Sequence, residues 1–85
     1  GHKKLTIDLQ DKITEIPVPL QKYDLSIGSN LMSLNYTYNV QAKQTGITNL
    51  LQDLKDVGLK LRDLKTEQST LEKIFVSLVK EKNEN

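Results

Sequence analysis

The groups in this chain that could move protons or attack a substrate are its carboxylates and a single histidine. Eleven residues are Asp or Glu, the only histidine is His2, and there is no cysteine. We interpret Gly1-His2 as an expression-tag remnant, so no histidine remains to pair with a nucleophile. The carboxylates before the C-terminal segment fall on expected polar faces or loops, where we expect solvated charges: Asp8, Asp11, Glu15, Asp24, Asp53, Asp56, Asp63 and Glu67.

The sequence also lacks the usual motifs for binding phosphate or a metal ion. The four glycines, at positions 1, 28, 46 and 58, are scattered, and none is followed by the Gly-Lys-Ser/Thr of a phosphate-binding loop. The absence of cysteine removes a thiolate metal site and a disulfide framework, which fits a reducing cytosol. We therefore expect no enzymatic activity, no bound cofactor and no metal site in these residues.

One aromatic stripe could in principle bind nucleic acid. Tyr36 and Tyr38 share a strand face with Met32 and Leu34, and RNA-binding sheets stack bases on such residues. No basic cluster and no Lys/Arg-Gly-Phe signature accompanies them. We therefore expect the stripe to pack in the core, with the tyrosine hydroxyls at the edge of the sheet.

Composition supports a small globular domain without an extreme charge. Of the 85 residues 27% are charged and 36% apolar, and the net charge is +1. This balance gives no reason to expect nucleic acid or anionic lipid as a partner. No apolar run approaches the roughly 20 residues of a membrane-spanning helix, so we expect no direct membrane insertion. We expect one domain over residues 3–82 and a frayed tail at 83–85.

The elements that must position these residues begin with a strand and a loop. Leu5, Ile7 and Leu9 alternate with polar residues, the period of a half-buried strand. Pro17 and Pro19 then forbid a long helix, so we expect a loop with at most one helical turn at 18–22. Four apolar residues of this loop could lie under the sheet: Ile13, Ile16, Val18 and Leu20.

A hairpin, a helix and another strand are predicted next. Leu25 and Ile27 lead into the turn residues Gly28-Ser29-Asn30, and the tyrosine-bearing strand follows. An apolar stripe then has helical spacing, with Thr45 as the expected N-cap and Gly58 just past the C-terminus. Its members are Ile47, Leu50, Leu51, Leu54 and Val57. In the strand "LKLRDLKT" the period slips at 63–64, which indicates either a bulge or the end of the strand.

The C-terminal stretch "TEQSTLEKIFVSLV" predicts an amphipathic helix. Ser69 and Glu72 have the spacing of a capping box, and one face is apolar. That face consists of Leu71, Ile74, Phe75, Leu78 and Val79. Such a stripe can cover the domain's own sheet or meet a partner. Our hypothesis is that Leu71 and Phe75 anchor the helix to its own domain, leaving part of Ile74, Leu78 and Val79 available.

The expected order is strand, loop or short turn, strand, strand, helix, strand, helix. With a degenerate first helix this is the βαββαβ order of an α+β ferredoxin-like or ACT-like antiparallel sheet, carrying an extra C-terminal helix. A small barrel with flanking helices is the alternative.

The terminal stretch resembles the Ser-Leu-Glu-Asp-Ile/Val-Phe-x-x-Leu pattern that ends the ATP-binding subunits of many bacterial ATP-binding-cassette (ABC) transporters, particularly exporter-type systems. The resemblance extends more loosely upstream through "LNYTYNVQAKQTGITNLLQDLKDVGLKLRDLKT". Two positions depart from the pattern, because Thr70 stands where Ser or Pro is common and Lys73 where an acidic residue is common. The motif positions are occupied by Ser69, Leu71, Glu72, Ile74, Phe75 and Leu78.

The resemblance implies a C-terminal accessory domain with a structural or regulatory role in ATP-driven transport. Its expected partners are its own N-terminal ATPase domain, a second ATP-binding subunit and the membrane permease. These would place it in the cytoplasm at the inner face of the cell membrane. ATP and Mg²⁺ would belong to the parent subunit, since Walker A, signature and Walker B motifs are absent from these residues. The rival hypothesis is an independent ACT-like module for small-ligand binding or dimerisation.

Overall fold

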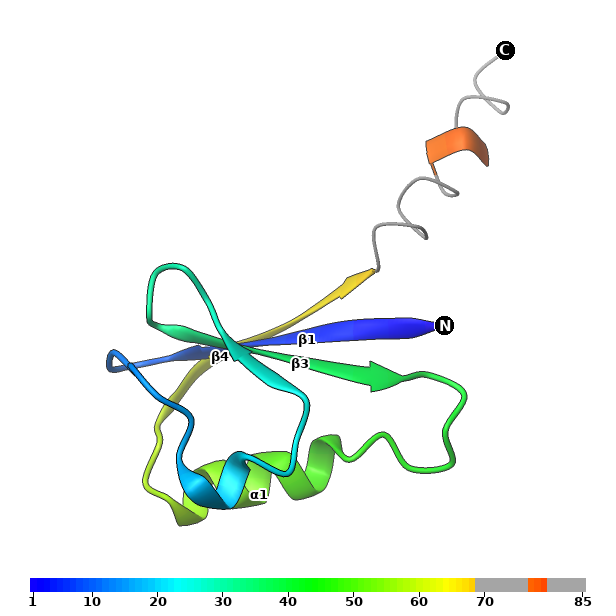
Figure 1. Ribbon diagram of the computed structural model, residues 1–85. Helices are drawn as coiled ribbons and strands as arrows, with labels where there is room; N and C mark the ends of the chain where they lie inside the picture. The colour runs from blue at the N-terminus through cyan, green and yellow to red at the C-terminus, as the bar shows by residue number, and fades with distance from the viewer. Residues whose placement is uncertain (69–76, 80–85) are drawn as a thin grey trace.

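The computed structural model describes residues 1–68 and 77–79, and its elements form one sheet with helical segments on one face (Figure 1). Four antiparallel strands lie side by side in the order β2-β3-β1-β4. The expected α+β class with an antiparallel sheet is therefore confirmed. The elements in chain order are β1 (His2–Leu9), η1 (Val18–Leu20), β2 (Leu25–Ile27), β3 (Ser33–Asn39), α1 (Ile47–Asp56) and β4 (Leu61–Gln68).

Strand β1 is the central strand and provides much of the core. Leu5, Ile7 and Leu9 are buried, whereas Thr6 and Asp8 lie on the opposite, partly exposed face. This alternation follows the sequence prediction, because successive side chains of a strand point to opposite faces. The strand starts at His2, which pairs with Asn39. It thus includes a residue that we had left out of the fold as part of a tag remnant.

The hairpin of β2 and β3 is confirmed, and the aromatic stripe faces inward. Leu34 and Tyr36 are buried, and Tyr38 is half-buried beside them. In the connecting loop the Asn30 side-chain oxygen accepts hydrogen bonds from the Met32 amide at 3.0 Å and from the Ser33 hydroxyl at 3.3 Å. The turn chemistry expected from the sequence therefore holds the two strands at this end.

The segment between β1 and β2 forms only a single 3₁₀ turn, as its prolines predict. Ile13 and Leu20 are buried in the core and Ile16 packs at its margin. Val18 differs, since its side chain is 78% exposed, so the expectation that it could lie under the sheet is wrong. It begins a three-residue turn whose buried residue is Leu20, which leaves Val18 pointing to solvent.

Helix α1 covers the sheet with the predicted stripe. Leu50 and Leu54 are fully buried, and the other members of the stripe are partly buried. Its C-terminus has the predicted left-handed glycine: Gly58 has φ +85°, its amide bonds the Lys55 carbonyl, and the Leu59 amide bonds the Leu54 carbonyl. These two bonds are those of a Schellman motif, which satisfies the last carbonyls of a helix.

The N-terminus of α1 differs from the prediction by one residue. The N-cap is Gly46, in the left-handed region at φ 79°, and no side chain caps the helix at that position. Thr45, the residue expected there, makes only a long 3.5 Å contact from its hydroxyl oxygen to the Ile47 amide. A tertiary contact explains the glycine, because a Cβ at position 46 would lie 2.7 Å from the Tyr36 hydroxyl oxygen.

Strand β4 pairs with β1 and contains a bulge. Asp63 is opposite Asp8 and Leu61 is opposite Leu9, so Arg62 has no partner of its own. Of the two explanations offered for the slip in apolar period near residues 63–64, a bulge or the end of the strand, the structure shows the bulge. Leu61 and Leu64 share the inner face with Leu9 and Ile7, yet they are 36% and 41% exposed.

Candidate functional site

Most of the motif predicted to carry function lies outside the described residues. Ser69, Leu71, Glu72, Ile74 and Phe75 are in this group, as are the two departures from the motif. Residues 77–79 are described and are helical. Leu78 is 57% exposed and Val79 is 42% exposed. Two members of the predicted stripe are thus presented to solvent, as the hypothesis of an available surface requires.

The core that the structure describes is formed by other residues. All of its buried side chains lie between Leu5 and Leu54 along the chain, and the partly buried ones extend only to Leu59. Leu78 and Val79 are not among them. Since large apolar side chains gain free energy when removed from water, these two residues are candidates for contact with a further surface.

A second cluster of interest joins the 3₁₀-turn segment to α1. The Tyr23 hydroxyl donates a hydrogen bond to the Asp53 carboxylate at 2.6 Å, and the Lys22 ammonium lies 3.1 Å from the same carboxylate oxygen. The Lys22 ammonium also lies 5.5 Å from the centre of the Tyr23 ring. Asp53 was expected to be only a solvated charge, but it instead links two segments. The sequence contains no signal for this, because the partners are far apart along the chain.

The cluster changes the pKa of both titrating partners in opposite directions. Burial, together with the hydrogen bond to Asp53 and its negative charge, raises the pKa of the Tyr23 hydroxyl to about 12. The hydrogen bonds from Tyr23 and Lys22 lower the pKa of Asp53. A general acid or base works best with a pKa near the working pH. Both pKa values move away from neutrality, and the contacts link the segment after η1 to α1.

Tyr36 connects this cluster to the loop before α1. Its ring meets that of Tyr23 edge-on with centroids 6.0 Å apart, and it stacks on Tyr38 at the same distance. Its hydroxyl donates a 2.7 Å hydrogen bond to the Thr45 carbonyl. Tyr36 therefore packs against both rings and its hydroxyl lies close to Gly46, so it has the structural role that we expected for this stripe.

Two open hollows flank the first turns of α1. The first is lined by consecutive residues of the approach to the helix, from Lys43 to Asn49. The second combines the Tyr23–Asp53–Lys22 cluster with Asn49 and Gln52. Both are lined by polar groups that could form hydrogen bonds with a small polar ligand. Within the described residues no three His, Cys, Asp or Glu side chains gather in a way that could hold a metal ion.

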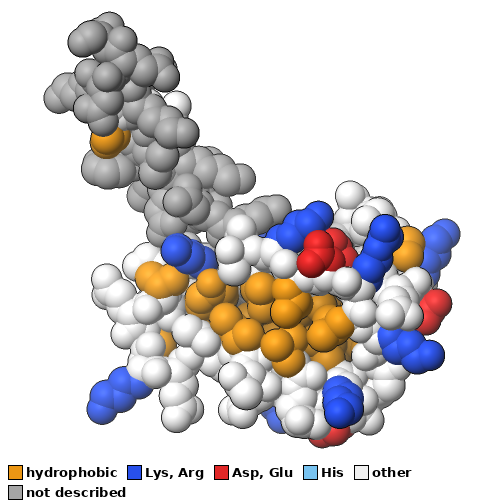
Figure 2. Space-filling view, turned by 180° about the vertical axis from the view of Figure 1, so that it is seen from behind, with side chains coloured by type: hydrophobic (Ala, Val, Ile, Leu, Met, Phe, Trp, Pro, Cys, Tyr) orange, Lys and Arg blue, Asp and Glu red, His pale blue; other side chains and the backbone are white. Residues whose placement is uncertain are grey.

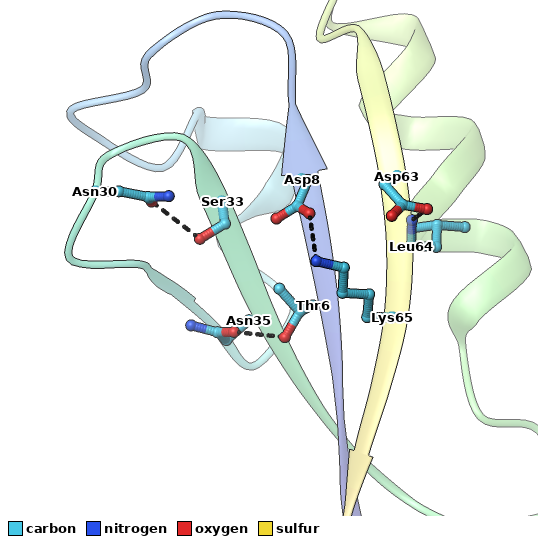
Figure 3. A network of polar contacts seen from close by, with 8 residues as sticks. All are labelled: Thr6, Asp8, Asn30, Ser33, Asn35, Asp63, Leu64 and Lys65. Atoms are coloured by element: carbon cyan, nitrogen blue, oxygen red, sulfur yellow. Dashed lines mark hydrogen bonds and ion pairs between the residues drawn. The ribbon is translucent and has the colours of Figure 1, made fainter.

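The outer face of the sheet is polar (Figure 3). Thr6 donates a 3.1 Å hydrogen bond to the Asn35 side chain, and the Lys65 ammonium lies 3.5 Å from the Asp8 carboxylate. The Asp63 carboxylate accepts a 2.9 Å bond from the Leu64 amide and is the direct strand partner of Asp8. Two carboxylates thus share this side of the sheet, with Lys65 bonded to one of them.

The opposite view of the molecule shows where apolar side chains remain visible. In Figure 2 hydrophobic side chains gather in the middle of the face turned away from the viewer of Figure 1. The exposed leucines of β4 lie on the sheet face that α1 packs against, next to fully buried residues of β1. The helical layer therefore leaves the inner face of β4 partly uncovered.

Comparison with protein-family models, with curated proteins and with solved structures finds no match for this chain. Among the helices of the described ranges, none has the length and apolar character needed to cross a membrane.

Proposed function

We propose that this chain is a C-terminal accessory domain of the ATP-binding subunit of an exporter-type bacterial ABC transporter. Its role is structural or regulatory, and it neither binds ATP nor catalyses a reaction. The observation that supports this best is the exposure of Leu78 and Val79 on a helical turn, outside the described core. Exposed apolar side chains such as these two are suited to a partner surface.

The partner in this proposal is the ATPase domain of the same subunit or its second copy, through which the domain joins the permease at the inner face of the cell membrane. ATP and Mg²⁺ belong to that ATPase domain. The terminal stripe modulates the transport cycle by packing on it, and the polar cluster around Asp53 stays within the accessory domain.

The topology supports a ferredoxin-like or ACT-like arrangement with a degenerate first helix. Strands β1 and β2 are both antiparallel to β3, so they run parallel to each other with β3 between them. The connection between them contains η1 in place of a full helix. This is the order expected for a split βαβ unit whose first helix has been reduced to a single turn.

The decisive test is the reading frame upstream of this sequence. We expect it to encode an ATP-binding cassette with Walker A and Walker B motifs. The cassette, expressed separately, should bind this chain, and Leu78→Asp should weaken that binding at least tenfold. Ser77→Asp is the matched control, since it adds the same charge to the same exposed turn without removing an apolar side chain. A frame without a cassette, or equal effects of the two variants, would contradict the proposal.

The second candidate is an ACT-like small-ligand module, and the hollow that contains Tyr23, Asn49 and Asp53 favours it. A thermal-shift screen of small polar metabolites distinguishes the two. A ligand that raises the melting temperature of the chain, and fails to do so for Asp53→Asn, would support the sensor.

Calorimetric titration of the chain with Mg-ATP should show no heat of binding, and micromolar affinity would overturn the accessory-domain proposal.

A further inference from the structure

The edge of the sheet at β4 is long and accessible. Within the described residues β4 is paired with β1 on one side only, and it runs for eight residues against three for β2 at the other edge. The outer side of an edge strand presents amide and carbonyl groups that can accept another strand. On β4 the Leu64 amide donates a 2.9 Å hydrogen bond to the Asp63 carboxylate, and a partner strand would replace this bond. An edge of this length is therefore a candidate for pairing between chains.

Apolar side chains accompany this edge. Leu64 is the strand partner of fully buried Ile7, and Leu61 is the partner of buried Leu9, yet both leucines of β4 remain more than a third exposed. A neighbouring strand beyond β4 would cover them from the open side, because directly opposed residues of paired strands lie on the same face and touch. The backbone and the side chains thus favour the same position for a partner.

The charges on the outer face indicate which strand could take this position. Asp63 is the strand partner of Asp8, and like charges opposite each other destabilise a sheet. The Lys65 ammonium compensates Asp8 at 3.5 Å, and Asp63 has no ion-pair partner within the described residues (Figure 3). A strand that brings a cation opposite Asp63 would remove this imbalance.

We propose that the occupant of this edge is a second copy of the chain, joined by antiparallel pairing of β4 with β4 about a two-fold axis. An axis perpendicular to the sheet keeps the inner faces of both copies on the same side. It passes midway between the two copies of one residue, which are then directly opposed. Centring the pair on Leu64 places the two Leu64 side chains together on the inner face. It also places Asp63 of each copy opposite Lys65 of the other on the outer face.

Neighbouring registers are less favourable by the same rule. Centring on Asp63 opposes two aspartates, and centring on Lys65 opposes two lysines. Centring on Thr66 pairs Lys65 with Glu67, but it leaves Leu64 opposite Gln68 and so does not cover the exposed leucine with another apolar side chain. Among these registers, only the one centred on Leu64 covers this leucine with another apolar side chain and places a lysine opposite Asp63.

Charge reversal provides the first test, which uses the whole 85-residue chain in sedimentation equilibrium. In the Asp63→Lys variant two lysines would face each other across the axis, and in Lys65→Asp two aspartates would do so. Each variant should therefore self-associate at least tenfold more weakly than the native chain. An equimolar mixture should regain the native affinity, because both opposed pairs then become Asp–Lys. Asp24→Lys is the control, since it makes the same charge change beside β2 at the far edge. A monomeric native chain at about 1 mM, or a mixture that does not recover, would overturn the proposal.

Cysteine cross-linking gives a second, independent readout because the chain contains no cysteine. Leu64→Cys should form a disulfide-linked dimer under mild oxidation, since opposed side chains on paired strands are close enough to bridge. Leu61→Cys has similar exposure but lies beyond the Arg62 bulge, away from the axis and from its own copy in the partner, and it should remain largely unlinked. Equal cross-linking of the two variants would indicate random collision and reject this register. Neither experiment involves an ATPase domain, so their outcome is independent of the transporter proposal.

Discussion

At the scale of single residues, the contact between Tyr23 and Asp53 predicts a dependence of stability on pH. The pKa of Tyr23 is about 12 in the folded chain against an ordinary value of 10.0. Its stabilising contribution is therefore complete below pH 10 and is lost as the pH rises toward 12. Chemical denaturation between pH 9 and pH 12 should show this loss in the native chain, and Tyr23→Phe should show a smaller one over the same range.

At acidic pH the contribution of the same contact to stability changes in the opposite direction, because here it is lost as the pH falls. Because the pKa of Asp53 is lowered from 3.8, its contribution is present above pH 3.8 and disappears as the pH falls through the lower, folded value. Asp53→Asn should therefore flatten the acid side of the stability profile. An unchanged acid limb in this variant would mean that the 2.6 Å hydrogen bond and the Lys22 contact do not persist in solution.

Two left-handed glycines allow a matched comparison. Gly46→Ala must place a methyl group 2.7 Å from the Tyr36 hydroxyl oxygen and also adopt a positive φ. Gly58→Ala must also adopt a positive φ, but no atom lies within 4 Å of the new methyl group. We expect Gly58→Ala to cost about 1–2 kcal/mol and Gly46→Ala to cost more, by denaturant melts. Equal costs would show that the close approach of Tyr36 does not contribute.

At the scale of elements, the two sides of α1 should respond differently to truncation. Leu54 is fully buried, whereas Leu51 is only partly so. Leu54→Ala should lower the free energy of unfolding by roughly 2–5 kcal/mol, because it opens a cavity in a small core. Leu51→Ala should cost clearly less in the same urea titration. A larger loss for Leu51 would mean that this side of the helix is covered in solution.

Local periodicity explains which elements could be predicted from the sequence. The alternation in β1 and the helical stripe of α1 reflect burial of one face, and both patterns are written into neighbouring residues. The slip in the period of β4 was visible for the same reason, but the local pattern did not distinguish a bulge from the end of the strand. The N-cap was placed one residue too early because the requirement for glycine at position 46 comes from Tyr36, across the fold.

Contacts between distant segments could not be predicted in this way. The exposure of Val18 depends on how a three-residue turn sits against α1, and the link between Tyr23 and Asp53 depends on packing η1 beside that helix. Asp53 and Asp56 are both acidic residues of one helix, and nothing in the local sequence indicates that Asp53 is the one that contacts Tyr23 and Lys22. For the terminal motif, the structure describes only Leu78 among the six predicted site residues.

At the scale of the whole molecule, the described core lies apart from the C-terminal residues. Leu78 is exposed and outside the buried cluster, so Leu78→Asp should change the melting temperature of the isolated chain very little, with a cost within about 0.5 kcal/mol. Ser77→Asp again serves as the control. A loss of several kcal/mol for Leu78→Asp alone would assign the terminal stripe to the domain's own core.

The central position of β1 also determines the order in which the chain can complete its fold. Lys3 pairs with Gln68, so β1 is synthesised before the other strands of this sheet but its second edge stays uncovered until residue 68 has been made. The hairpin of β2 and β3 needs only neighbouring residues and can form early. Closing such a long loop is entropically costly, which slows folding relative to proteins with local contacts. A nascent chain halted at residue 60 would expose one side of the strand that holds Ile7, and a chaperone that binds extended apolar segments would find its target there.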